Sequence, residues 1–150
     1  MRVSLILLAG LAVFMVPNFL RSDWTSSAQA ESLEGEPRLV AAMFRSSWCS
    51  ACRVLEPRVE DVREDYADRS VEFVRFDFTL GRRDSLRERA EAEGIVEVFD
   101  ELEGRTGFLV LMDRETGQVF EIVTMRYGRE EIREAFDRWL FVTEDRGAST

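Results

Sequence analysis

The feature that most constrains this chain is an apolar run that leads directly into two closely spaced cysteines. The run Arg38–Phe44 (R-L-V-A-A-M-F) has strand length and is apolar on both faces, which is typical of a central, buried strand. After a short loop, from Cys49 to about Tyr66, apolar residues recur at spacings of three and four and predict an amphipathic helix. Pro57 lies inside this helix and is expected to kink it.

The rest of the chain continues to alternate between strand and helix patterns. A strand is expected over Val71–Phe78, followed by a helix from Asp84 or Ser85 to about Phe99 that Gly94 ends early or bends. A loop over Glu101–Gly107 leads into a hairpin, whose strands Phe108–Met112 and Gln118–Met125 are joined by the turn Asp113–Gly117. A helix over Arg129–Val142 follows. The order β-α-β-α-β-β-α predicts an α/β fold with a mixed four-stranded sheet and helices on both faces.

The composition excludes most other kinds of chemistry. All 20 basic residues are arginine, and neither histidine nor lysine occurs in the 150 residues. The chain therefore offers no histidine-based triad, no Cys–His dyad, no histidine-ligated metal site and no lysine for a Schiff base. The net charge of −9 argues against a nucleic-acid partner, which requires a basic face. The pair Cys49 and Cys52 remains as the main group capable of covalent chemistry.

The first thirty residues have the pattern of a secretory signal. Arg2 precedes the apolar segment Val3–Val16, and Ala28-Gln29-Ala30 has the small-x-small form of a signal-peptidase site. We expect residues 1–30 to be removed, leaving a domain over 31–143 and a flexible tail over 144–150; an uncleaved membrane anchor is the alternative. This pattern predicts a periplasmic or secreted protein. A disulfide between two cysteines so close together closes only a very short loop and stabilises a fold little, so a structural disulfide framework is not indicated.

The position of the cysteines favours redox chemistry. Cys49 falls at the expected start of the first helix, where free backbone N–H groups and the helix dipole stabilise a thiolate. Cys52 lies one turn further on the same face. We therefore expect Cys49 to attack a partner disulfide and Cys52 to resolve the mixed disulfide. Trp48 next to the nucleophile offers a flat apolar surface to a partner chain.

The segment Trp48-Cys49-Ser50-Ala51-Cys52 resembles the W-C-x-x-C motif of the thioredoxin superfamily. The resemblance extends over about Arg38–Leu140. It includes the basic Arg53 after the second cysteine, Pro57 at the position of the helix-kinking proline, the third strand with its turn, and Tyr127-Gly128 before the last helix. It implies a thioredoxin-like fold, thiol–disulfide oxidoreductase activity, and supporting positions at Ser50, Ala51, Arg53 and Pro57.

Three departures from that family concern the site itself. Thr106-Gly107 stands where the family has a cis-proline before the third strand; this loop would bind the substrate chain, and its change leaves room for a metal at the thiols. Met43 stands where thioredoxins have a buried acid, so a proton relay is missing or supplied elsewhere, with Glu56 as a weak candidate. Ser50-Ala51 matches neither the Gly-Pro of thioredoxin nor the pairs of strong oxidants.

The sequence is therefore interpreted as a secreted thiol–disulfide oxidoreductase that acts on protein disulfides or dithiols, with reduction as the expected direction. No organic cofactor or metal is expected, because the Cys49–Cys52 disulfide is itself the redox group. A membrane electron donor is the expected partner of a periplasmic reductase, and the protein is expected to be a monomer. The alternatives are a disulfide oxidant or isomerase, a non-catalytic module that holds a metal or an apoprotein through its thiols, and a fold kept only as an interaction scaffold.

Overall fold

The computed structural model of the protein describes residues 37–102 and 104–148, so the expected signal over 1–30 lies outside the described residues. The elements follow in the order β1 (Leu39–Arg45), α1 (Ser50–Asp65), β2 (Val71–Asp77), α2 (Arg83–Ala92), α3 (Val96–Leu102), β3 (Phe108–Asp113), β4 (Val119–Thr124) and α4 (Arg129–Ala148). No helix within the described ranges combines the length and apolar character needed to cross a membrane.

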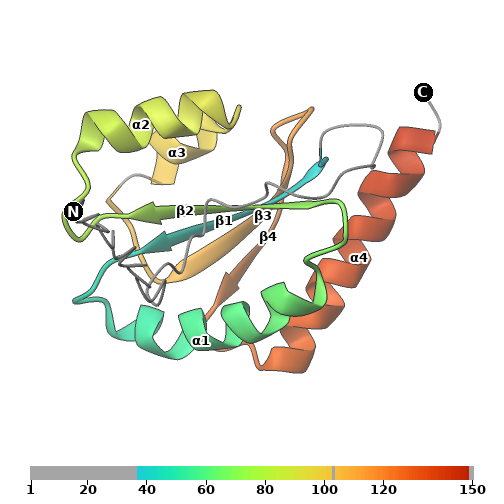
Figure 1. The fold of residues 1–150 in the computed structure, drawn as a ribbon, viewed down its shortest axis with the longest axis horizontal. Helices are drawn as coiled ribbons and strands as arrows, with labels where there is room; N and C mark the ends of the chain where they lie inside the picture. Colours follow the sequence, from blue (N-terminus) through green and yellow to red (C-terminus); the bar gives the residue numbers. More distant parts are fainter. Residues whose placement is uncertain (1–36, 103, 149–150) are drawn as a thin grey trace, which may run out of the picture.

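The four strands form one mixed sheet in the order β2-β1-β3-β4 (Figure 1). β1 runs parallel to β2 and antiparallel to β3, and β3 and β4 form an antiparallel hairpin with a register shift between Leu111 and Met112. The apolar run that opens the domain is thus an interior strand with a partner on each edge. The predicted mixed four-stranded sheet is confirmed.

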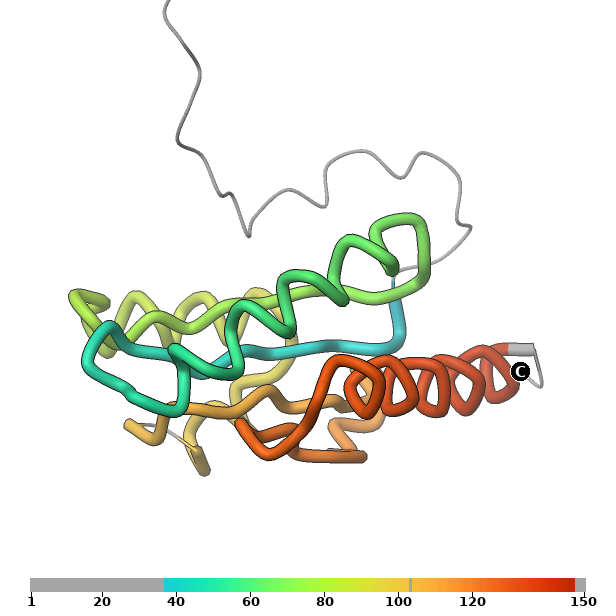
Figure 2. Tube along the Cα trace, turned by 90° about the horizontal axis from the view of Figure 1, so that it is seen from below, coloured from blue at the N-terminus to red at the C-terminus, as the bar shows by residue number. Residues whose placement is uncertain are grey.

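Alternate residues of β1 enter two separate cores. Leu39, Ala41 and Met43 are fully buried against α1 and α4, while Val40, Ala42 and Phe44 are fully buried against α2 and α3. Figures 1 and 2 show α1 and α4 together on one side of the sheet and α2 and α3 on the other. Successive side chains of a strand point to opposite faces, so a strand covered on both sides is apolar throughout. The predicted helices on both faces are confirmed.

Four segments meet at the edge of the sheet where β1 and β2 end and β3 begins. They are residues 46–49 after β1, 78–82 after β2, 104–107 before β3, and 125–128 after β4. The last segment lies at this edge because Thr124 at the end of β4 is opposite Phe108 at the start of β3. We call these four segments the cysteine edge. It lies at the left of Figure 1, where α1 and α2 also begin.

Gly94 divides the expected helix over Asp84–Phe99 into two. α2 ends at Ala92, Gly94 takes a positive φ of 71°, and α3 starts at Val96. α3 also continues to Leu102, so the loop expected from Glu101 starts later than predicted. The reason is packing: Val98, Phe99 and Leu102 bury one side of this short helix in the core of the α2–α3 face.

The last helix is longer than expected and corrects the predicted tail. α4 continues past Val142 to Ala148, so most of the tail expected over 144–150 is helical. Tertiary contacts hold this last part: Arg146 forms an ion pair with the buried Asp113 at 3.5 Å, and Glu144 lies 3.7 Å from Arg69. Such contacts join distant parts of the chain and do not show in local periodicity.

We expect Phe44→Ala to cost about 3–5 kcal/mol of the free energy of unfolding, measured by chemical denaturation. The Phe44 ring is fully buried at the end of β1, with the rings of Phe76 and Phe108 each 5.1 Å away between centroids. Its removal leaves a cavity beneath the cysteine edge. Phe141→Ala is the matched control because that ring is 71% exposed, and its cost should stay within about 0.5 kcal/mol. Equal costs for the two variants would contradict the packing described here.

Candidate active site

The first cysteine forms the N-cap of α1. Cys49 has extended backbone angles (φ −77°, ψ 113°), and its sulfur accepts a hydrogen bond from the backbone N–H of Cys52 at 3.2 Å. Two hydrogen bonds fix the loop before Cys49. Cys49 N–H donates to the Ser46 carbonyl within the loop, and Ser47 N–H donates to Thr79 Oγ1 after β2 at 2.8 Å. A sulfur in this position can accept hydrogen bonds from the free N–H groups at the start of the helix, and it lies near the positive end of the helix dipole. The helix start predicted at Cys49 thus places the sulfur where a thiolate is stabilised.

The two thiols have opposite character. Cys49 is half-buried; burial raises the pKa of its thiol, but hydrogen bonds with the Cys52 and Thr106 side chains and with backbone N–H groups outweigh this and lower the pKa overall. Cys52 is buried, and burial, its hydrogen bond to Cys49 and the nearby charges of Cys49 and Glu56 raise its pKa to about 11. The more accessible sulfur is therefore the one that ionises first. This division fits an attacking Cys49 and a resolving Cys52.

The loop before β3 packs directly on the cysteine pair. Thr106 hydrogen-bonds Cys49, and Gly107 N–H donates to the Phe44 carbonyl at 2.8 Å. Gly107 has a positive φ of 102°, and a Cβ atom placed on it would lie 2.9 Å from the Ala51 Cβ and 3.2 Å from the Cys49 sulfur. All peptide bonds of the described residues are trans. Thr106 and Gly107 therefore lie beside the thiols, and a side chain at position 107 would crowd Ala51 and the Cys49 sulfur. Their binding of a substrate chain stays a prediction.

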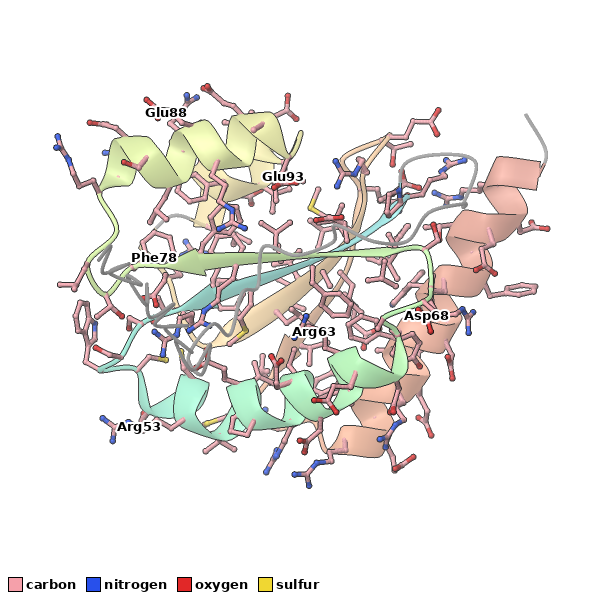
Figure 3. All side chains as sticks on the ribbon, in the orientation of Figure 1. Arg53, Arg63, Asp68, Phe78, Glu88 and Glu93 are labelled. Carbon is pink, nitrogen blue, oxygen red and sulfur yellow. The ribbon has the colours of Figure 1, made fainter. Side chains whose placement is uncertain are left out.

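The other expected site residues lie around this centre at different distances. Trp48 is 66% exposed beside the nucleophile, and Ser50 is exposed at the first position of α1. Arg53 is exposed near the start of α1 and points away from the fold (Figure 3). Pro57 is eight residues beyond Cys49, about 12 Å along the helix axis. It lies inside α1, on its exposed side.

A cluster of charged side chains lies beside Cys52 and was largely missed from the sequence. Glu56 pairs with Arg45 at 3.1 Å and with Arg75 at 2.9 Å, and Arg45 also binds Asp77 at 2.6 Å. Glu56 is four residues after Cys52, so the two share a side of α1. Met43, which stands where the related family has an acid, lies opposite Arg75 in the sheet. The alternation V-R-F-D-F in β2 was the available signal, because it places Arg75 and Asp77 on one face.

We expect Glu56→Gln to lower the pKa of Cys52. An anion near a thiol favours the protonated form, so its removal favours the thiolate. Arg45 and Arg75 then no longer have the Glu56 charge beside them, which acts in the same direction. The pH dependence of Cys52 alkylation in a Cys49→Ala background measures this shift. Glu60→Gln is the matched control, because Glu60 is one turn further along α1 and pairs with Arg63. A Cys52 pKa that is unchanged or raised in Glu56→Gln would contradict this account.

The donor set for a metal is limited in the described part of the chain. There, no group of three or more cysteine, aspartate or glutamate side chains is arranged to hold a metal ion, and the chain has no histidine. Cys49 and Cys52 offer two thiolates, whereas zinc sites use four ligands.

Comparison with known proteins relates the chain to one family. The thioredoxin family model matches residues 23–95, which include β1, α1, β2, α2 and both cysteines. Thioredoxin H8 of Arabidopsis thaliana is 36% identical over 56 residues, which are 37% of this chain and 35% of that protein. The chain therefore spans about a third of the length of this curated relative.

Solved structures with similar backbones include StoA of Bacillus subtilis (14% identity, 67% of this chain and 84% of that chain, TM-score 0.47) and the thioredoxin of Fasciola hepatica (24% identity, 69% and 82%, TM-score 0.40). Over residues 23–95, just under half of its length, the chain is therefore similar to the thioredoxin family, and the W-C-x-x-C motif lies inside that stretch.

Proposed function

We propose that the protein is a thiol–disulfide oxidoreductase whose redox group is the Cys49–Cys52 pair, and that it reduces disulfides of partner proteins. The observation that carries this proposal is the contrast between the two thiols. Cys49 is accessible, lies at the N-terminus of α1 and has a lowered pKa, while Cys52 is buried and has a raised pKa. A two-step exchange needs one thiolate that attacks first and one thiol that stays protonated until the second step. Cys49 and Cys52 have these two properties.

In the first step the Cys49 thiolate attacks one sulfur of the partner disulfide. The partner's S–S bond breaks, a mixed disulfide forms with Cys49, and the departing thiolate takes a proton from solvent. In the second step Cys52 loses its proton and attacks the Cys49 sulfur, which releases the second partner thiol. Two electrons pass from the cysteine pair to the partner, and the pair ends as a disulfide. A dithiol donor must then return two electrons.

We place this cycle in the periplasm or another secretory compartment, with a membrane-bound dithiol protein as the electron donor. The signal pattern over 1–30 supports this location, and an oxidising compartment requires a separate source of electrons for a reductase. The cycle requires no organic cofactor, and one copy of the chain holds the whole exchange centre.

The opposite direction, donation of disulfides, is the second candidate, and the lowered pKa of Cys49 favours it. A stabilised thiolate stabilises the reduced form of the pair and makes the disulfide more oxidising. The reduction potential decides between the two directions.

The test is a redox titration of the protein in graded thiol–disulfide buffers. Alkylation traps each state, and mass spectrometry counts the labels on Cys49 and Cys52. A reversible two-electron transition near the thioredoxin potential of about −270 mV supports the reductase, and one near about −120 mV supports a disulfide donor. The absence of a reversible transition would overturn both directions and favour a non-catalytic binding module.

A further inference from the structure

Two apolar side chains stand exposed on neighbouring loops of the cysteine edge. Trp48 is 66% exposed and Leu80 is 92% exposed. The hydrogen bond from Ser47 N–H to Thr79 Oγ1 joins the residues directly before each of them, so the two loops lie against one another. Covering an aromatic ring and a leucine with a partner's apolar side chain is favourable. The edge therefore has an apolar contact surface on the β1–β2 side of Cys49.

Four arginines without an ion pair to any described residue lie on the same edge. Arg53 is four residues after Cys49, one turn further along the same side of α1. Arg105 is two residues before Gly107, whose position adjoins the Cys49 sulfur. Arg82 is the N-cap residue of α2, in the loop that carries Leu80. Arg126 follows β4, and all four are exposed.

The loop that carries Arg126 is also fixed in place beside α1. The guanidinium of Arg58 donates to the carbonyls of Met125 and Tyr127 at 3.0 and 2.7 Å. Arg126 therefore lies between two residues that are tied to the helix that begins at Cys49. The four arginines, none of which forms an ion pair with a described residue, thus come from one helix and three loops of the cysteine edge.

This local charge contrasts with the rest of the surface. The whole chain carries a net charge of −9. Most other described arginines pair with carboxylates, namely Arg38, Arg63, Arg69, Arg87, Arg114, Arg129, Arg133, Arg138 and Arg146. At the cysteine edge the acids Glu56 and Asp77 are already bound to Arg45, and Glu131 accepts a hydrogen bond from Gly128 N–H. The exposed Asp84 lies in the first turn of α2. The cysteine edge thus carries exposed arginines that no described carboxylate pairs with, on a protein that is acidic overall.

We propose that the cysteine edge selects polypeptide partners whose reactive cysteine is flanked by acidic side chains together with an apolar one. The acidic side chains meet Arg53, Arg82, Arg105 and Arg126, and the apolar side chain covers Trp48 and Leu80. The inference rests on the proposed thiol–disulfide exchange and names its substrate class. Opposite charges on the two surfaces steer the encounter, and the acidic remainder of the protein repels a partner that approaches elsewhere.

The experiment uses two synthetic peptides that share one cysteine and one leucine and differ only in flanking glutamates or flanking arginines. Each is oxidised to its symmetric disulfide, and its reduction by the reduced full chain is followed by stopped-flow mixing and acid trapping. At low ionic strength we expect the acidic peptide to react about tenfold faster than the basic one. The ratio should fall toward one at about 1 M salt, where the screening length is about 3 Å.

Charge-reversal variants locate the effect. Arg53→Glu and Arg105→Glu, made singly, should each lower the ratio of acidic to basic rates severalfold. The ratio is the readout because any change in the reactivity of Cys49 alters both rates equally. Arg89→Glu is the matched control, because Arg89 also forms no ion pair with a described residue but lies further along α2; its ratio should equal that of the parent. Leu80→Ser should slow both peptides and leave the ratio unchanged.

The uncharged disulfide of mercaptoethanol separates the two possible failures. If the protein reduces it but reacts equally with both peptides at low salt, the charge selection is wrong and the exchange activity stands. If neither this disulfide nor any peptide is reduced, the proposed function is wrong and the inference falls with it. A ratio that drops as much in Arg89→Glu as in Arg53→Glu would also overturn the inference, because the selectivity would then reflect total charge.

Discussion

Replacing Cys49 with serine is expected to reduce disulfide exchange to the uncatalysed rate, whereas replacing Cys52 with serine is expected to trap the protein as a mixed disulfide with its partner. A serine hydroxyl stays protonated at the end of α1 and does not attack a disulfide, so the first step is lost. Without Cys52 the first step still occurs, but no thiol is available to release the partner. Mass spectrometry after mixing with a peptide disulfide detects the adduct and gives its rate of formation.

Ser50→Ala is the matched control for these two variants. Ser50 lies between the cysteines, is exposed, and lacks a sulfur, so its loss should leave both steps close to the parent rates. The opposite pattern, in which Cys49→Ser forms the adduct and Cys52→Ser does not, would exchange the roles of the two cysteines. Full activity of Cys49→Ser would exclude the cysteine pair from the reaction.

The sequence predicted those parts of the fold that depend on local patterns. An apolar run without alternation indicated that β1 would be covered on both faces, and the cysteines at its end indicated where a helix would begin. The structure has β1 between β2 and β3 and starts α1 at Ser50, directly after Cys49. The neighbourhood of Gly107 and the thiols was predicted through the family resemblance, since nothing local joins residues so far apart in the chain.

What the sequence did not predict depends on contacts between distant segments. The helix after Val142 is polar and has no strong pattern, but Arg146 pairs with Asp113, whose carboxylate is buried at the end of β3. The pairing of Glu56 with both Arg45 and Arg75 likewise needs three elements to come together. An isolated charge in a sequence is usually a solvated surface residue, and only the tertiary structure identifies the exceptions.

Gly107→Pro, which would restore the residue type that the related family has before its third strand, is expected to inactivate this protein. Proline requires φ near −65°, whereas Gly107 has a φ of 102°, and proline cannot donate the hydrogen bond that Gly107 N–H makes to Phe44 at 2.8 Å. We expect a loss of about 3 kcal/mol or more in the free energy of unfolding. The conformation of this loop therefore requires glycine at position 107, because the loop backbone there packs directly against Ala51 and the Cys49 sulfur.

Gly107→Ala tests the same point with a smaller change. Its methyl group would lie 2.9 Å from the Ala51 Cβ and 3.2 Å from the Cys49 sulfur, in addition to the strain of the positive φ. We expect a cost of about 1–3 kcal/mol and a slower reaction of Cys49 with peptide disulfides. Gly117→Ala is the matched control for backbone strain, because Gly117 has a φ of 69° and nothing within 4 Å of an added Cβ. It should lose stability but keep its exchange rate.

A second change separates crowding at the thiol from backbone strain. Ala51→Gly removes the methyl group that Gly107→Ala would meet, so the double variant should recover part of the exchange rate that the single variant loses, while the strain of the positive φ remains. If Gly107→Ala slows exchange no more than Gly117→Ala does, the loop does not control access to Cys49. If the double variant recovers nothing, the close contact of Ala51 with residue 107 is not what limits the reaction, and two causes are left: the approach of the new methyl group to the Cys49 sulfur and the backbone strain at residue 107.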